Sequence, residues 1–303
     1  MTVTTGDMVS AVEALPERPS FLTSCLGLIR RQPLGAAGLL FIVIMTVFAV
    51  GAEFLTSVDP EAQSFEHMLL PPSLDFILGT DQYGRDIWTR IVYGSRTALL
   101  IGFFAAIIGS TIGLVLGVAS AYFGGYFDLI FQRVMDVFMA FPLIILALAM
   151  VAIFGGKIEN DVILVIVAIT IPFVPRCARV VRSNALAIRE IPYVDAARAL
   201  GYTHTRIILR HMVPNVMAPY LIMITAFVGQ AILLEASLSY LGLGVQEPTP
   251  AWGLMLQGGA EEYAESAPWI AVFPGLAITI AVFGFNLFGD ALRDVLDPKL
   301  RSQ

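Results

Sequence analysis

The chain has 303 residues, of which 57% are hydrophobic and only 14% are charged. A water-soluble domain carries about 25% charged residues, so this composition predicts a protein that folds in a lipid bilayer. The formal net charge of −6 argues against a nucleic-acid partner, because nucleic acids are bound by basic surfaces.

Residues 1–32 form a polar N-terminal tail. Its first part, Met1 to Ser20, contains prolines and acidic residues but no apolar core and no small-residue cleavage site. A signal peptide needs both, so we expect a loose cytoplasmic tail instead. The membrane domain is then a single unit over residues 33–298.

Six apolar segments along the chain are predicted to cross the membrane. A spanning helix needs roughly 20 apolar residues to cross roughly 30 Å of hydrocarbon. The fourth segment contains Arg176 and Arg179, whose long side chains we expect to reach the membrane surface. Because backbone polar groups find no water in lipid, each span must be helical, and the fold class is an all-α integral membrane protein. The predicted spans cover residues 34–55, 97–123, 136–156, 161–181, 214–237 and 267–289.

Small residues recur at every fourth position of the second predicted span. This spacing places them on one helix face, where they let another helix approach closely. We expect that helix to belong to the same chain, with a second subunit as the alternative. The residues are Ala105, Gly109, Gly113, Gly117 and Ala121.

The distribution of arginine predicts the orientation, since cytoplasmic loops are enriched in Arg and Lys. Seven arginines lie between residues 176 and 210, whereas residues 244–268 contain four glutamates and neither Arg nor Lys. We therefore expect both termini and the segment 182–213 in the cytoplasm, and the acidic segment outside. Arg85, Arg90 and Arg96 lie in a predicted outer loop and oppose this orientation.

Segment 182–213 is predicted to form two short helices joined by a glycine turn. Pro192 suits the first position of a helix, and Gly201 is a natural helix stop. Thr203 can cap the second helix. Helices this short are marginal in water, so they need a partner surface.

This segment resembles the EAA loop of binding-protein-dependent ABC import permeases. Aspartate replaces the usual glutamate, and His211 and Val213 replace isoleucine and leucine, but the spacing matches throughout. The resemblance implies a MetI-like permease bundle whose cytoplasmic coupling helix docks on an ATP-binding subunit. The residues that carry it are Asp195, Ala196, Ala197, Gly201 and Pro214.

Further motifs resemble the C-type permease of dipeptide and oligopeptide importers, from about residue 34 to residue 298. The resemblance implies transport of dipeptides or oligopeptides through the bacterial inner membrane. Nickel complexes, glutathione and oligosaccharides are alternative solutes on the same scaffold. The motifs include Leu78-Gly-Thr80-Asp81, Ala140-Phe-Pro142, Leu234-Glu235-Ala-Ser-Leu238-Ser-Tyr240, Pro248-Thr-Pro250-Ala-Trp252-Gly253 and Asn286-Leu-Phe-Gly289-Asp290.

The family also implies the partners. A second homologous permease chain completes the pathway, two ATP-binding subunits lie beneath it, and an extracytoplasmic solute-binding protein docks outside. The sequence has no GxxxxGK[ST] phosphate loop, so we expect the partner subunits to handle ATP and Mg²⁺. We expect this chain to bind membrane lipid but no cofactor, and not to be an enzyme.

Gln230 and Glu235 are the candidates to line the pathway, because polar residues inside a membrane domain are functional by default. Glu235 could meet the ammonium group of a solute. The three histidines are not spaced as metal ligands, so no metal site is expected. Two alternatives remain. An ATP-independent secondary carrier predicts paired broken helices, and an intramembrane enzyme needs convergent polar residues within the spans.

Overall fold

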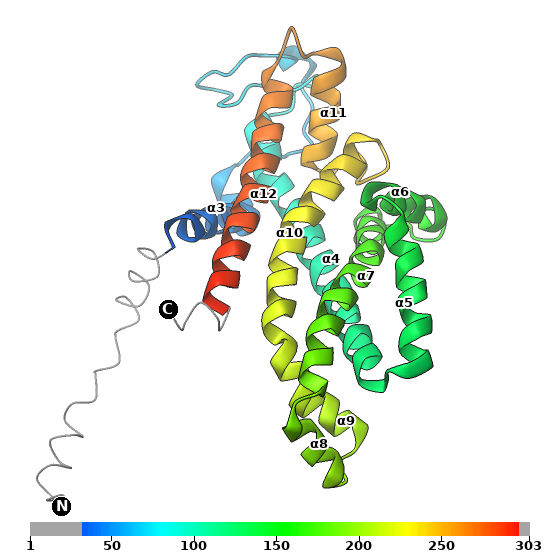
Figure 1. Cartoon of the computed structure of the whole chain (residues 1–303). Helices are drawn as coiled ribbons and strands as arrows, with labels where there is room; N and C mark the ends of the chain where they lie inside the picture. Colours follow the sequence, from blue (N-terminus) through cyan, green and yellow to red (C-terminus); the bar gives the residue numbers. More distant parts are fainter. Residues whose placement is uncertain (1–31, 297–303) are drawn as a thin grey trace, which may run out of the picture.

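A computed structural model describes residues 32–296, and its regular elements are helices (Figure 1). The predicted all-α fold is therefore confirmed, while the predicted tail lies almost entirely outside the described residues. The long helices are α3 (Pro33–Leu55), α4 (Ile87–Phe123), α7 (Asp161–Arg189), α10 (Met217–Tyr240) and α12 (Trp269–Leu296). The shorter elements are η1 (Phe65–His67), α5 (Gly125–Ala140), α6 (Leu143–Phe154), α8 (Pro192–Ala199), α9 (His204–Ile207), η2 (Ile208–Met212), η3 (Val213–Val216) and α11 (Trp252–Glu262).

Five helical stretches are long and apolar enough to cross a membrane, and the bent pair α5 and α6 makes a sixth. One stretch is the continuous run His204–Tyr240, which includes α9 and α10. Four predicted spans are longer than expected, including the fifth, which runs from His204 to Tyr240, and the sixth, which continues to Leu296. α4 begins at Ile87, where the Asp86 side chain accepts a hydrogen bond from the Thr89 N–H at 3.0 Å, and α7 continues to Arg189.

The third predicted span, 136–156, differs from the structure. The chain bends by 96° between α5 and α6, and α5 begins much earlier, at Gly125. Pro142 has no N–H group and forces the preceding Phe141 into an extended conformation with φ −85° and ψ 137°, which ends α5. Charged residues on α5 hid its helical start, but one of them, Asp128, is paired with Arg182 of α7.

The small residues of α4 pack against α7 of the same chain, as expected. A Cβ atom added to Gly113 would lie 2.6 Å from the Cβ of Cys177, and one added to Gly117 would lie 2.5 Å from the carbonyl oxygen of Ala178. Such distances are too short for any side chain. The glycines therefore allow the backbones of α4 and α7 to approach each other closely.

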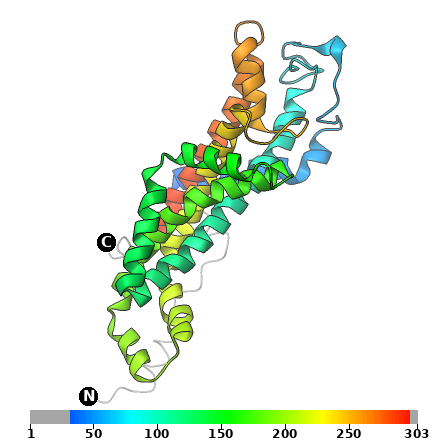
Figure 2. The same cartoon turned by 90° about the vertical axis from the view of Figure 1, so that its right-hand side faces the viewer.

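The loops 56–86 and 241–268, which include α11, form a head at one end of the molecule. The short helices α8 and α9 lie at the opposite end (Figure 1, Figure 2). α4 and α10 run from the head towards the hairpin, whereas α12 ends short of it (Figure 1), so a movement at one end can be transmitted to the other through α4 and α10.

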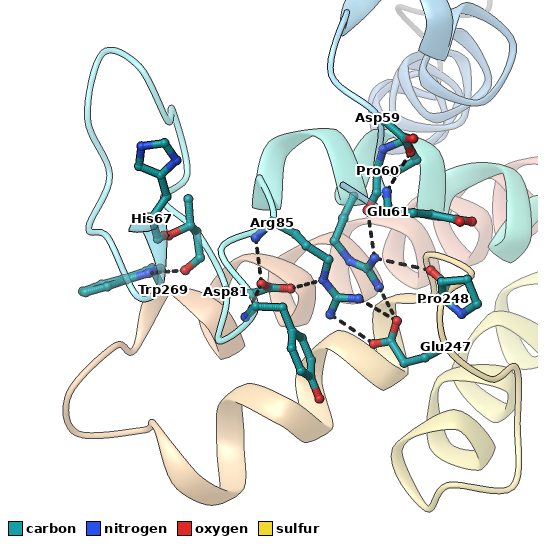
Figure 3. Close-up of polar contacts among 12 residues, drawn as sticks. Asp59, Pro60, Glu61, His67, Asp81, Arg85, Glu247, Pro248 and Trp269 are labelled. Atoms are coloured by element: carbon teal, nitrogen blue, oxygen red, sulfur yellow. Dashed lines mark hydrogen bonds and ion pairs between the residues drawn. The ribbon is translucent and has the colours of Figure 1, made fainter. Parts of the chain in front are cut away.

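A cluster of four charged side chains joins the two loops of the head (Figure 3). Arg85 donates from Nε to Asp81 at 2.6 Å, and from Nη1 and Nη2 to the two carboxylate oxygens of Glu247 at 2.6 and 3.1 Å. Arg90 donates to the same carboxylate at 3.3 Å and to the carbonyl oxygen of Pro60 at 3.0 Å. The side chains of Arg85 and Arg90 are only 4% and 0% exposed, so these bonds satisfy charges that water cannot reach.

The same pairing accounts for the arginines that oppose the predicted orientation. Arg85 and Arg90 are bound within the cluster, and Arg96 of α4 pairs with Glu53 of α3 at 3.3 Å. All three cations are therefore engaged by carboxylates of the chain itself.

Glu247 lies between two arginines, and its pKa reflects this position. Burial by itself would raise the pKa, but the hydrogen bonds from Arg85 and the charges of both arginines hold the pKa of Glu247 below its ordinary value. The stabilisation from this carboxylate is therefore complete above the ordinary glutamate pKa of about 4.3, and it is lost as the pH falls through the lower folded value.

We predict that Glu247→Gln destabilises the head by about 2 kcal/mol or more. The change leaves two buried guanidinium groups without one of their counter-charges, and unpaired buried charges are costly. Thermal unfolding of the purified protein in detergent at pH 7 would measure the loss.

Glu53→Gln is the matched control. It breaks the pair with Arg96, in which the Glu53 side chain is 70% exposed, so we expect a loss below about 1 kcal/mol. Equal effects of the two substitutions would contradict a structural role for the buried cluster.

Candidate functional site

The hairpin of α8 and α9 has the form that the sequence predicts. Pro192 occupies the first turn of α8, and Gly201 has φ +74°, a left-handed conformation that favours glycine. Thr203 caps α9, where its hydroxyl accepts a hydrogen bond from the Arg206 N–H at 3.4 Å. Pro214 lies in η3, which leads directly into α10.

Most of the predicted contact residues of the hairpin are exposed, and one is buried. Asp195, Ala196 and Gly201 are exposed. Ala197 is only 4% exposed and faces the protein's own core, as does Val194 one turn earlier. Ala197 is therefore buried on the inner side of α8 in this structure.

Leu200, which the sequence reasoning did not single out, is 73% exposed at the end of α8. A large apolar side chain on a protruding helix is suited to insertion into a partner's groove. Its position in a run of strong helix formers hid this property, because such a run does not reveal which side chain points outward.

The hairpin is attached to the end of α4. The Tyr122 hydroxyl and Nδ1 of His204 form a hydrogen bond of 2.7 Å, and the Arg198 guanidinium lies 5.3 Å from the centre of the Tyr122 ring. Arg198 also pairs with Asp195 at 3.1 Å. A displacement of α8 would therefore act on α4 through Tyr122.

Of the two candidates for the pathway, Glu235 has a different environment from the one expected. Its side chain is 1% exposed, and its Oε1 atom accepts a hydrogen bond from Ser239 at 2.8 Å. The Ser239 hydroxyl in turn accepts from the Val245 N–H at 3.2 Å. Glu235 thus supports the start of the loop that carries Glu247, and no passing solute could reach it in this conformation.

Gln230 is partly exposed and has a cationic partner. Its Oε1 atom accepts a hydrogen bond from Nη1 of Arg176 at 3.2 Å. The sequence predicts that the side chain of Arg176 extends to the membrane surface. Instead, it reaches from α7 to Gln230 of α10. One turn away, the rings of Phe173 of α7 and Phe227 of α10 stack with their centres 4.3 Å apart, which stabilises the contact between α7 and α10.

Comparison with known proteins agrees with this architecture. Residues 109–302 match the family described as binding-protein-dependent transport system inner membrane component. Residues 28–72 match the N-terminal TM domain of oligopeptide transport permease C.

Curated relatives cover most of the chain. A dipeptide transport system permease protein of Alkalihalophilus pseudofirmus is 42% identical over 90% of this chain and 88% of its own length. A glutathione transport system permease protein of Pectobacterium atrosepticum is 40% identical over 90% and 89%.

Among solved structures, an inward-facing MetNI methionine ABC transporter has a chain with a similar fold. It is 21% identical, with a TM-score of 0.56 over 70% of this chain and 97% of that chain. The family match spans most of the chain, and the two relatives extend it to nine-tenths, so this protein belongs to the family of binding-protein-dependent transport system inner membrane components.

Proposed function

We propose that this permease subunit of an ABC importer carries dipeptides or oligopeptides through the bacterial inner membrane, together with a second permease chain. The 42% identical dipeptide permease supports this solute class, and the 40% identical glutathione permease supports a tripeptide-like solute as the second candidate. An extracytoplasmic solute-binding protein delivers the solute to the head.

The observation that carries the proposal is the hairpin of α8 and α9. It protrudes at the end opposite the head (Figure 2) and exposes Asp195, Ala196 and Leu200. A small residue and an apolar side chain on one short helix suit a groove of another protein. We propose that this protein is one of two ATP-binding subunits, which bind ATP and Mg²⁺, and that the hairpin and both termini are cytoplasmic.

Within this proposal, Tyr122 transmits movement of the hairpin to the membrane helices. Its hydrogen bond with His204 and its contact with Arg198 join the hairpin to α4. α4 packs against α7 without intervening side chains at Gly113 and Gly117. A displacement of α8 would therefore be transmitted to both α4 and α7.

The ATP-independent carrier is less well supported. Such carriers are built from repeats with matched broken helices. Within residues 32–296 a single pair of helices, α5 and α6, forms a broken span. A single break does not supply the paired half-helices that the carrier mechanism uses.

We predict that Gly201→Val uncouples ATP hydrolysis from transport. A β-branched residue at φ +74° costs about 1–2 kcal/mol and displaces the turn that orients α8. The number of ATP molecules hydrolysed per peptide imported, measured for the complete complex in vesicles, should rise severalfold.

Gly201→Asn is the control for that substitution, because asparagine tolerates the left-handed conformation. No atom of the described residues lies within 4 Å of an added Cβ at this position, so the β-carbon itself meets no steric clash within this chain. Unchanged coupling in the valine variant would exclude the hairpin from the ATPase contact.

A second prediction concerns Tyr122→Phe. The change removes one hydrogen bond to His204, worth about 1 kcal/mol, and keeps the ring. We expect slower peptide import by the complex, with assembly and ATP binding retained. Tyr126→Phe, on a residue that is 87% exposed, should leave import unchanged, and equal rates for the two variants would reject the role of Tyr122.

A further inference from the structure

Three arginines follow one another along α7, and carboxylates of α5 neutralise two of them. Arg182 donates from Nε to Asp128 at 2.5 Å. Arg179, one turn earlier, pairs with Asp136. α5 runs beside α7 over this distance (Figure 1). The row of cations is thus matched by a row of anions on the neighbouring helix.

Arg176 continues the row but has no carboxylate partner within residues 32–296. α5 ends at Ala140, and after the bend at Pro142 the neighbour of α7 is α6, whose residues Leu143–Phe154 include no carboxylate. The hydrogen bond of Arg176 is to a neutral amide, Oε1 of Gln230. An uncompensated cation in a membrane domain is costly, and such residues face ligand pathways.

A small hollow lies against this guanidinium. It has a volume of about 40 Å³ and is otherwise apolar, so it has room for a group the size of a carboxylate but not for a whole peptide. The residues that line it are Phe138, Met139, Phe141, Leu143, Leu146, Pro172 and Arg176.

The bond to Gln230 leaves the rest of the guanidinium available. Gln230 uses Nη1, and no hydrogen bond within the described part of the chain engages Nε or Nη2 of Arg176. These two N–H groups point the same way and form the fork that binds a carboxylate through two parallel hydrogen bonds. The other side chains that line the hollow are apolar, and a carboxylate bound among them would interact with the guanidinium more strongly than it would in water.

We propose that Arg176, held in place by Gln230, binds the carboxylate of the transported solute during its passage. This inference rests on the proposed function, since a peptide with a free C-terminus supplies the carboxylate. Gln230 acts as a positioning residue, and Arg176 makes the contact. The remainder of the solute lies outside the hollow, in the pathway shared with the second permease chain.

The experiment compares two solutes that differ only in the carboxylate. The complete complex, in phosphatidylcholine vesicles supplied with its binding protein, imports labelled trialanine or trialanine amide. Each variant is compared with the wild type for each peptide separately, so any preference of the binding protein cancels. Arg176→Gln should lower trialanine import at least tenfold and leave import of the amide unchanged, and Arg176→Lys should restore part of the loss.

Arg179→Gln is the matched control. It also removes an arginine from α7, one turn from Arg176, but Arg179 is already paired with Asp136 of this chain. It should not change the ratio of the two import rates. An equal loss of both peptides in Arg176→Gln would overturn the proposal, as it would show a purely structural role. The proposal would also be overturned if the second permease chain were lost from the complex in Arg176→Gln but retained in Arg176→Lys. That result would show that a carboxylate of the second chain is the counter-charge of Arg176.

An error in the proposed function and an error in the role of Arg176 would give different results. If the wild-type complex imports neither peptide, the proposed peptide function is wrong, and the role of Arg176 falls with it. If the wild type imports trialanine and Arg176→Gln leaves the ratio unchanged, only the role of Arg176 is wrong.

Discussion

The close contact between α4 and α7 is the constraint on which the remaining structure depends. Glycines at positions 113 and 117 leave no space between the two helices, since an added Cβ would lie 2.6 Å from Cys177 and 2.5 Å from the Ala178 carbonyl oxygen. α4 reaches the head at one end and Tyr122 at the other. α7 carries the arginine row and leads into the hairpin. Two functional regions therefore share one rigid pair of helices.

Charge compensation organises the molecule at both ends of this pair. In the head, Asp81 and Glu247 neutralise Arg85 and Arg90, which are inaccessible to water. Along α7, Asp128 and Asp136 neutralise Arg182 and Arg179. An arginine of the same helix without a carboxylate partner is therefore an exception to this pattern. Among the four arginines of α7, Arg176 is the one without an ion pair within the described residues, and it lines a hollow with room for a carboxylate.

The bend between α5 and α6 connects these observations. Pro142 ends α5 and turns the chain by 96°. The hollow beside Arg176 is lined with apolar residues from both sides of the break, Phe138 and Met139 of α5 and Leu143 and Leu146 of α6. The segment that borders Arg176 on this side therefore supplies apolar side chains and no carboxylate.

The sequence by itself determined the class of fold, most of the apolar helices, and the form of the hairpin. Apolar segments of bilayer length must be helices, and Pro192, Gly201 and Thr203 act through local backbone chemistry that needs no distant partner. The family resemblance rested on the same local motifs.

Only the tertiary structure decided which side chains are buried and which neighbours they contact. Periodicity places a residue on a helix but does not say which neighbour it meets. Ala197 and Glu235 were expected at a partner surface and in the pathway, yet they are 4% and 1% exposed because other helices cover them. Conversely, Arg176 was expected at the membrane surface, and its contact with Gln230 depends on the crossing of α7 and α10. Such contacts join residues far apart in the chain, so only packing in three dimensions can establish them.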